Sequence, residues 1–156
     1  MQNQDAVHKM VQPHLVFAER QPRQVAKILI VDDDVDSAIS VQSPFSQMGC
    51  TVEFALSADE AQRKISSCKS DIIILDWMLD HRTRADEVVA GAMRLIAKFA
   101  TRNPRKLKII TFSSRTESEI ILPPNDLYEH IAHWRKPLQY PELTRRTVQI
   151  LNYLGF

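Results

Sequence analysis

Glycine and cysteine are scarce in this sequence, and long hydrophobic runs are missing. Three glycines among 156 residues leave little material for long flexible linkers. The two cysteines, Cys50 and Cys68, form no CxxC pair and no zinc-type cluster, which is typical of a reduced, cytoplasmic chain. No apolar run approaches the roughly 20 residues of a membrane helix, and the first residues lack the apolar core of a signal peptide.

An excess of charge of either sign is also missing. The 20 basic and 19 acidic residues give a formal net charge of +1. The whole molecule therefore has no electrostatic reason to bind nucleic acid or an anionic membrane directly. The length suits one domain with a single core. We predict an N-terminal arm or tail over 1–25, which is rich in glutamine and broken by two prolines, and a folded domain over 26–156.

Apolar strands and amphipathic helices alternate along the chain from Lys27 onward. We predict strands at 28–31, 51–54, 71–76, 107–112 and 131–135. We predict helices at 36–48, 57–67, 88–100, in parts of 115–131, and at 141–154. Such alternation favours an α/β fold, in which a doubly wound, five-stranded parallel sheet has helices on both faces.

Local signals mark several helix ends. Gly49 is placed to end the first helix, and Pro44 predicts a kink or a late restart inside it. Ser57, with Glu60 three residues later, predicts a capping box for the second helix. The Pro123–Pro124 pair is expected to break the fourth helical region.

Polar side chains follow several of the predicted strands. Because sites in open α/β sheets lie beyond the carboxyl ends of the strands, these side chains are the candidate site residues. They are Asp32, Asp33, Asp34, Asp76, Ser113, Ser114 and Lys136. Clustered carboxylates favour a hard cation such as Mg²⁺. A carboxylate next to such a cation can attack phosphorus and form an acyl phosphate, while a lysine and a hydroxyl bind the transferred oxygens.

Four segments, KILIVDDD, DIIILDWML, IITFSS and WRKP, resemble the site motifs of the response regulator receiver domain. The resemblance extends over about 26–154, with the motifs at the ends of strands one, three, four and five. It implies the flavodoxin-like, CheY-like (βα)5 fold and a phosphorylation switch in a two-component system. It also implies a protein that is no enzyme beyond self-catalysed phosphoryl uptake and autodephosphorylation.

The resemblance assigns a role to each matching residue. Asp76 matches the phosphoacceptor. The ligands of Mg²⁺ or Mn²⁺ would be Asp32, Asp33, Asp76 and the backbone carbonyl of Met78. Phosphoryl binding and switching would fall to Ser113, Ser114 and Lys136. Thr111 competes with Ser113 for the switch role, but the strand phase favours Ser113 at the tip. His133 matches the signalling position, and the peptide bond before Pro137 is expected to be cis.

The resemblance also implies partners. A histidine kinase or a phosphotransfer protein would supply the phosphoryl group. A downstream protein or an output domain would contact the face made by helix four, strand five and helix five. A homodimer is left open, as is the place of this chain within a longer protein.

One loop departs from the receiver pattern, and the first acid motif also fits a different function. The loop 77–87 is long and charged, with Asp80 where the family usually has proline, and it carries His81. A receiver fold that binds partners without phosphorylation is therefore an alternative. The Asp32-x-Asp34 spacing also suits a phosphohydrolase of the haloacid dehalogenase type, in which the first motif holds the nucleophile.

Overall fold

The computed structural model describes residues 24–99 and 106–156, so most of the predicted arm at 1–25 lies outside the described residues. The strands are β1 Lys27–Val31, β2 Thr51–Ala55, β3 Ile72–Leu75, β4 Met78–Leu79, β5 Thr83–Arg84, β6 Leu107–Ser113 and β7 Tyr128–Arg135. The helices are α1 Val35–Gln47, α2 Ala58–Ser66, α3 Ala85–Phe99 and α4 Tyr140–Leu154, with a 3-10 turn, η1, at Glu117–Glu119. Within the described ranges, no helix has the length and apolarity needed to cross a membrane.

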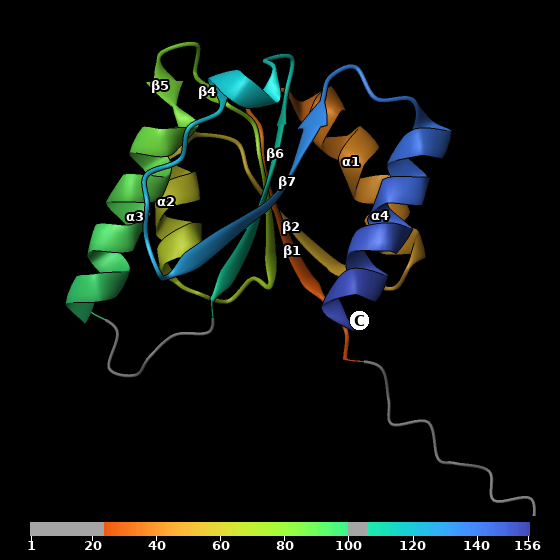
Figure 1. Ribbon diagram of the computed structural model, residues 1–156, viewed down its shortest axis with the longest axis horizontal. Coiled ribbons are helices and arrows are strands. Elements are labelled where there is room, and N and C mark those ends of the chain that lie inside the picture. The colour runs from red at the N-terminus through yellow and green to blue at the C-terminus, as the bar shows by residue number, and fades with distance from the viewer. Residues whose placement is uncertain (1–23, 100–105) are drawn as a thin grey trace, which may run out of the picture.

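Five parallel strands form the central sheet, in the order β2-β1-β3-β6-β7. Helices α2 and α3 cover one face of the sheet, and α1 and α4 cover the other (Figure 1). The strand order changes direction between β1 and β3, which is where open sheets of this type leave a crevice. The predicted doubly wound α/β fold class is confirmed.

The sheet is buried on both faces, which explains its apolar sequence. All four residues of β3 are buried, and alternate side chains enter opposite layers. Ile72 and Ile74 pack in the layer of α1 and α4, whereas Ile73 and Leu75 pack in the layer of α2 and α3. These two apolar layers fix the end of β3, and therefore the position of the residue that follows it.

Two of the predicted helix signals act largely as expected. Gly49 has φ +83° just after α1, and the Ser57 hydroxyl accepts the Glu60 N–H at 3.2 Å at the start of α2. The other half of the predicted capping box differs, because the Glu60 carboxylate accepts the N–H of Leu56 rather than that of Ser57. The predicted late restart at Pro44 is wrong, because α1 runs through it as one helix. Pro44 lies only three residues from the end of the helix, where the loss of one N–H donor interrupts little.

The fourth helical region differs from its prediction. Residues 114–127 form only the turn η1, followed by an irregular segment that leads into β7. β7 begins at Tyr128, three residues earlier than the predicted strand. The Pro123–Pro124 pair explains the loss of the helix, since neither proline has an N–H to donate and the residue before a proline avoids helical geometry. The signalling face expected from helix four, strand five and helix five therefore lacks its first helix.

Candidate functional site

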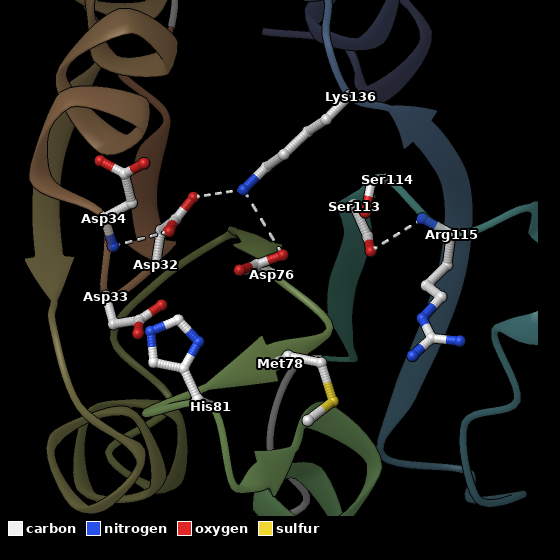
Figure 2. A pocket seen from close by; sticks show the side chains of 10 residues that line it. All are labelled: Asp32, Asp33, Asp34, Asp76, Met78, His81, Ser113, Ser114, Arg115 and Lys136. Carbon is white, nitrogen blue, oxygen red and sulfur yellow. Dashed lines mark hydrogen bonds and ion pairs between the residues drawn. The ribbon is translucent and has the colours of Figure 1, made fainter.

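A pocket of about 450 Å³ opens at the carboxyl edge of the sheet. Four strands supply its polar residues: the central strand β3, its neighbours β1 and β6, and the edge strand β7 beyond β6. Figure 2 shows the residues that line the pocket, which are Asp32, Asp33, Asp34, Asp76, Met78, His81, Ser113, Ser114, Arg115 and Lys136. The structure thus brings every sequence-predicted residue of the acid, hydroxyl and lysine set to one pocket.

The three consecutive aspartates after β1 have different surroundings. Asp32 is buried, with only 2% of its surface exposed, and accepts hydrogen bonds from the Ser37 hydroxyl at 2.7 Å and the Asp34 N–H at 2.9 Å. Asp33 is half-buried and accepts the N–H of Asp80 at 3.2 Å. Asp34 caps α1 by accepting N–H bonds from Asp36 and Ser37. The cap role leaves the first two carboxylates to serve the pocket.

Asp76 follows β3 and lies at the centre of the acid cluster. Its N–H donates to the Val31 carbonyl at 2.8 Å, which continues the pairing of β3 with β1. Burial raises the pKa of Asp76 to about 6, with the Asp32 carboxylate adding to the rise and Lys136 opposing it. The charged form of Asp76 is therefore destabilised by its surroundings, so additional positive charge is favoured here.

Carboxylate oxygens of Asp32, Asp33 and Asp76 lie within 4.8 Å of one another. Lys136 reaches Asp32 at 2.7 Å and Asp76 at 3.4 Å, while Asp33 has no ion pair among the described residues. Three carboxylates facing one ammonium leave net negative charge, and oxygen donors of this kind suit Mg²⁺ or Mn²⁺. The donor set thus fits a divalent cation, and Met78 lies on the same pocket wall.

Both the backbone and the side chain of Lys136 are held in place. Its backbone N–H donates to the Ser113 carbonyl at 2.8 Å, and its side-chain Nζ lies 5.0 Å from the centre of the Phe112 ring. The Lys136–Pro137 peptide bond is cis, the isomer expected from the sequence. Figure 2 shows the side chain reaching across the pocket to a point between Asp32 and Asp76.

The hydroxyl residues after β6 lie where strand phase places them. Ser113 ends the strand and lines the pocket, and its hydroxyl accepts the Arg115 N–H at 3.2 Å. Thr111 is fully buried and absent from the pocket lining, which agrees with the choice of Ser113 over Thr111. Ser114 is exposed at the rim. The N-cap of η1 is Thr116, so Ser114 does not cap this turn.

The long loop after Asp76 contains a small hairpin that the sequence did not reveal. Strands β4 and β5 pair antiparallel, Leu79 is fully buried, and the turn holds Asp80 and His81 at φ +53° and +54°. The Asp80 carboxylate accepts the Ala58 N–H at the start of α2, at 3.3 Å. The loop is therefore anchored to the site and to a helix, and it places His81 on the pocket wall beside Asp33 (Figure 2).

His133 and Trp134 point to opposite faces of β7. Trp134 is buried and stacks on Phe45 of α1, with ring centroids 6.4 Å apart. The His133 ring contacts the Thr111 hydroxyl at 2.9 Å through Nδ1 and the Arg115 carbonyl at 2.8 Å through Nε2. The predicted signalling residue is thus connected to the segment that follows Ser113.

Solved structures resemble this chain across most of its length, although no protein-family model and no curated protein matches it. A two-component response regulator from Clostridium difficile is 22% identical with a TM-score of 0.62, over 85% of this chain and 100% of that one. The chemotaxis response regulator CheY4 of Vibrio cholerae is 23% identical with a TM-score of 0.60, over 82% and 100%. A CheY-like receiver domain from Methylobacillus flagellatus is 17% identical with a TM-score of 0.60, over 81% and 99%. The chain therefore has the CheY-like fold of receiver domains.

Proposed function

We propose that this chain is the receiver domain of a two-component phosphorelay and accepts a phosphoryl group on Asp76. The observation that carries the proposal is the setting of Asp76, which lies at the end of β3 among two other carboxylates and one lysine. A carboxylate in such a setting gains from a cation beside it and from a phosphoryl group that its neighbours can bind.

The residues of the pocket have different roles in the proposed phosphoryl transfer. Asp32, Asp33, Asp76 and the Met78 carbonyl would hold Mg²⁺ or Mn²⁺, which would neutralise charge on the transferred oxygens. An Asp76 carboxylate oxygen attacks phosphorus and forms the acyl phosphate bond. The bond from phosphorus to the donor breaks, and the leaving group keeps the electron pair and takes up a proton. Phosphoryl oxygens are then bound by Lys136, Ser113 and Ser114.

The partners follow from this chemistry. A histidine kinase or a phosphotransfer protein is the proposed donor, because a phosphorylated imidazole is a good leaving group for a carboxylate nucleophile. The output is proposed to be protein–protein contact at the face formed by β7, α4 and the segment 114–127. The fold also occurs within longer proteins, since NtrX from Brucella abortus matches 83% of this chain over 26% of its own length.

A phosphohydrolase that uses the first motif is the competing function, and the surroundings of Asp32 argue against it. Asp32 is buried, paired with Lys136 at 2.7 Å and bonded to two further donors, so it is not presented as a nucleophile. The Asp76 carboxylate is more accessible than that of Asp32, because 16% of its side chain is exposed.

Intact-mass measurement after incubation with Mg²⁺ and acetyl phosphate or phosphoramidate tests the proposal. We expect one phosphoryl adduct that is absent without Mg²⁺ and absent in Asp76→Asn, while the exposed-acid control Asp126→Asn is labelled like the wild type. Continuous turnover that is lost in Asp32→Asn but kept in Asp76→Asn would establish the phosphohydrolase instead. The absence of an adduct with any donor, including a phosphorylated histidine protein, would identify a receiver fold that works without phosphorylation.

A further inference from the structure

Three side chains form a hydrogen-bonded line on the sheet face that lacks the fourth helix. The fully buried Thr111 hydroxyl lies 2.9 Å from Nε2 of His130 and 2.9 Å from Nδ1 of His133. The other ring nitrogen of His133 lies 2.8 Å from the Arg115 carbonyl oxygen. These contacts join β6, β7 and the segment after β6. In the layer of α2 and α3, Thr111 is a polar residue among apolar neighbours.

An irregularity in β7 puts both histidines on the same face. Side chains three positions apart on a regular strand point to opposite faces. Here the register skips Ile131, because Ile109 pairs with His130 and Ile110 pairs with Ala132. The additional residue re-aims the strand, so that both rings meet the Thr111 hydroxyl. A bulge that gathers two histidines on one buried hydroxyl is a feature of this chain that the assigned site does not require.

The count of protons on His133 fixes the direction of its two hydrogen bonds. A neutral imidazole has one N–H to donate and one nitrogen that accepts, and His133 has one contact at each nitrogen. The Arg115 carbonyl can only accept, so His133 donates to it from Nε2 and must accept at Nδ1 from Thr111. His130 lies on the other side of the Thr111 oxygen and also makes a hydrogen bond with the Ala132 backbone. Burial lowers the pKa of His130, which favours its neutral form.

Arg115 connects this line to the pocket. Its N–H donates to the Ser113 hydroxyl at 3.2 Å, while its carbonyl accepts from His133. If Ser113 turns its hydroxyl to a phosphoryl oxygen, Arg115 loses the contact that holds its N–H. The backbone that anchors His133 is then free to shift, and any movement of His133 reaches the Thr111 hydroxyl and His130.

We propose that Thr111 is a positioning residue that holds His133 against the Arg115 carbonyl. We also propose that these hydrogen bonds transmit a movement of Ser113 in the pocket to His130. The inference rests on the proposed function for its trigger, but the order of its protons does not. His130 rather than a fourth helix would then report phosphorylation to a partner at β7. The variant Thr111→Val removes the hydroxyl at nearly constant volume, and Thr111→Ser restores it.

Imidazole nitrogen NMR of the unphosphorylated protein at about pH 8, where free imidazole is neutral, tests the proton order by itself. We expect an Nε2–H and a hydrogen-bonded Nδ1 on His133, and the Nδ1 signal moves to the position of a free acceptor in Thr111→Val and returns in Thr111→Ser. The matched control is Thr147→Val, because the buried Thr147 hydroxyl has no hydrogen-bond partner among the described residues. An Nδ1–H on His133, or an unchanged His133 signal in Thr111→Val, would overturn the proposed order.

The same spectra after acetyl phosphate and Mg²⁺ test the coupling. We expect the His130 and His133 signals both to shift in the wild type and in Thr147→Val. In Thr111→Val the mass adduct still forms, but the shift of His130 is lost. Equal His130 shifts with and without the Thr111 hydroxyl would refute the line. A wild type that forms no adduct would refute the proposed function and leave the proton order to be judged by the first measurement.

Discussion

At the scale of a single residue, Asp76 makes stability depend on pH. Burial raises its pKa to about 6 from an ordinary value of 3.8, so the folded protein binds more protons than the unfolded chain between these values. The free energy of unfolding therefore falls as pH rises from about 4 to about 6, and it stays at the lower value above pH 6. The rise in the pKa of Asp76 from 3.8 to about 6 corresponds to at most about 3 kcal/mol of stability.

The variant Asp76→Asn removes this ionisation. In metal-free buffer we expect it to be more stable than the wild type by about 1–3 kcal/mol above pH 7, with the gain disappearing by about pH 4, where the wild-type carboxyl is already protonated. Urea denaturation of both proteins across this pH range measures the difference. Asp126→Asn, at an exposed acid, is the control and should show no such pH-dependent gain. A less stable Asp76→Asn above pH 7 would contradict the expected effect of burial.

At the scale of an element, the β4–β5 hairpin depends on Asp80 in two ways. Its φ of +53° is a conformation that aspartate tolerates and alanine does not, and its carboxylate accepts the Ala58 N–H. Asp80→Ala loses both advantages and should cost about 2 kcal/mol, whereas Asp80→Gly loses only the hydrogen bond and should cost about 1 kcal/mol or less. Urea denaturation measures both changes. Equal losses for alanine and glycine would mean that the left-handed turn is not the cause.

The hairpin and the missing helix also show where prediction from sequence ends. The strands with continuous apolar runs were predicted almost to the residue, because burial on both faces leaves few alternatives. The acid, hydroxyl and lysine residues were predicted by their places at strand ends, and the pocket gathers them.

Other elements carried weaker signals. The strands β4 and β5 have two residues each, which is too short to show the alternation of a strand. Their turn contains Asp80 and His81, where a hairpin usually has glycine or asparagine. The bulge at Ile131 has no sequence signature, so the meeting of His130 with His133 emerged only from the structure. The Pro123–Pro124 pair did indicate a break, but not that the whole helix would be replaced.

At the scale of the whole molecule, the acid cluster should make stability depend on divalent cations. A ligand that binds only the folded state stabilises it, by about 2.7 kcal/mol at one hundred times its dissociation constant. For a domain of this size we expect saturating Mg²⁺ to raise Tm by several degrees. Thermal unfolding with MgCl₂, against NaCl at matched ionic strength, measures the gain.

Two neighbouring aspartates separate a cation site from general screening. Asp33→Asn removes a member of the carboxylate cluster and should lose most of the gain from Mg²⁺. Asp34→Asn is the matched control, because asparagine caps α1 as well as aspartate and Asp34 lies outside the cluster. Mg²⁺ should also reduce the advantage of Asp76→Asn, since a cation next to Asp76 relieves the penalty on its charge. If Mg²⁺ raised the Tm of the wild type, Asp33→Asn and Asp34→Asn equally, the effect would belong to the surface as a whole. The cluster would then hold no resident cation.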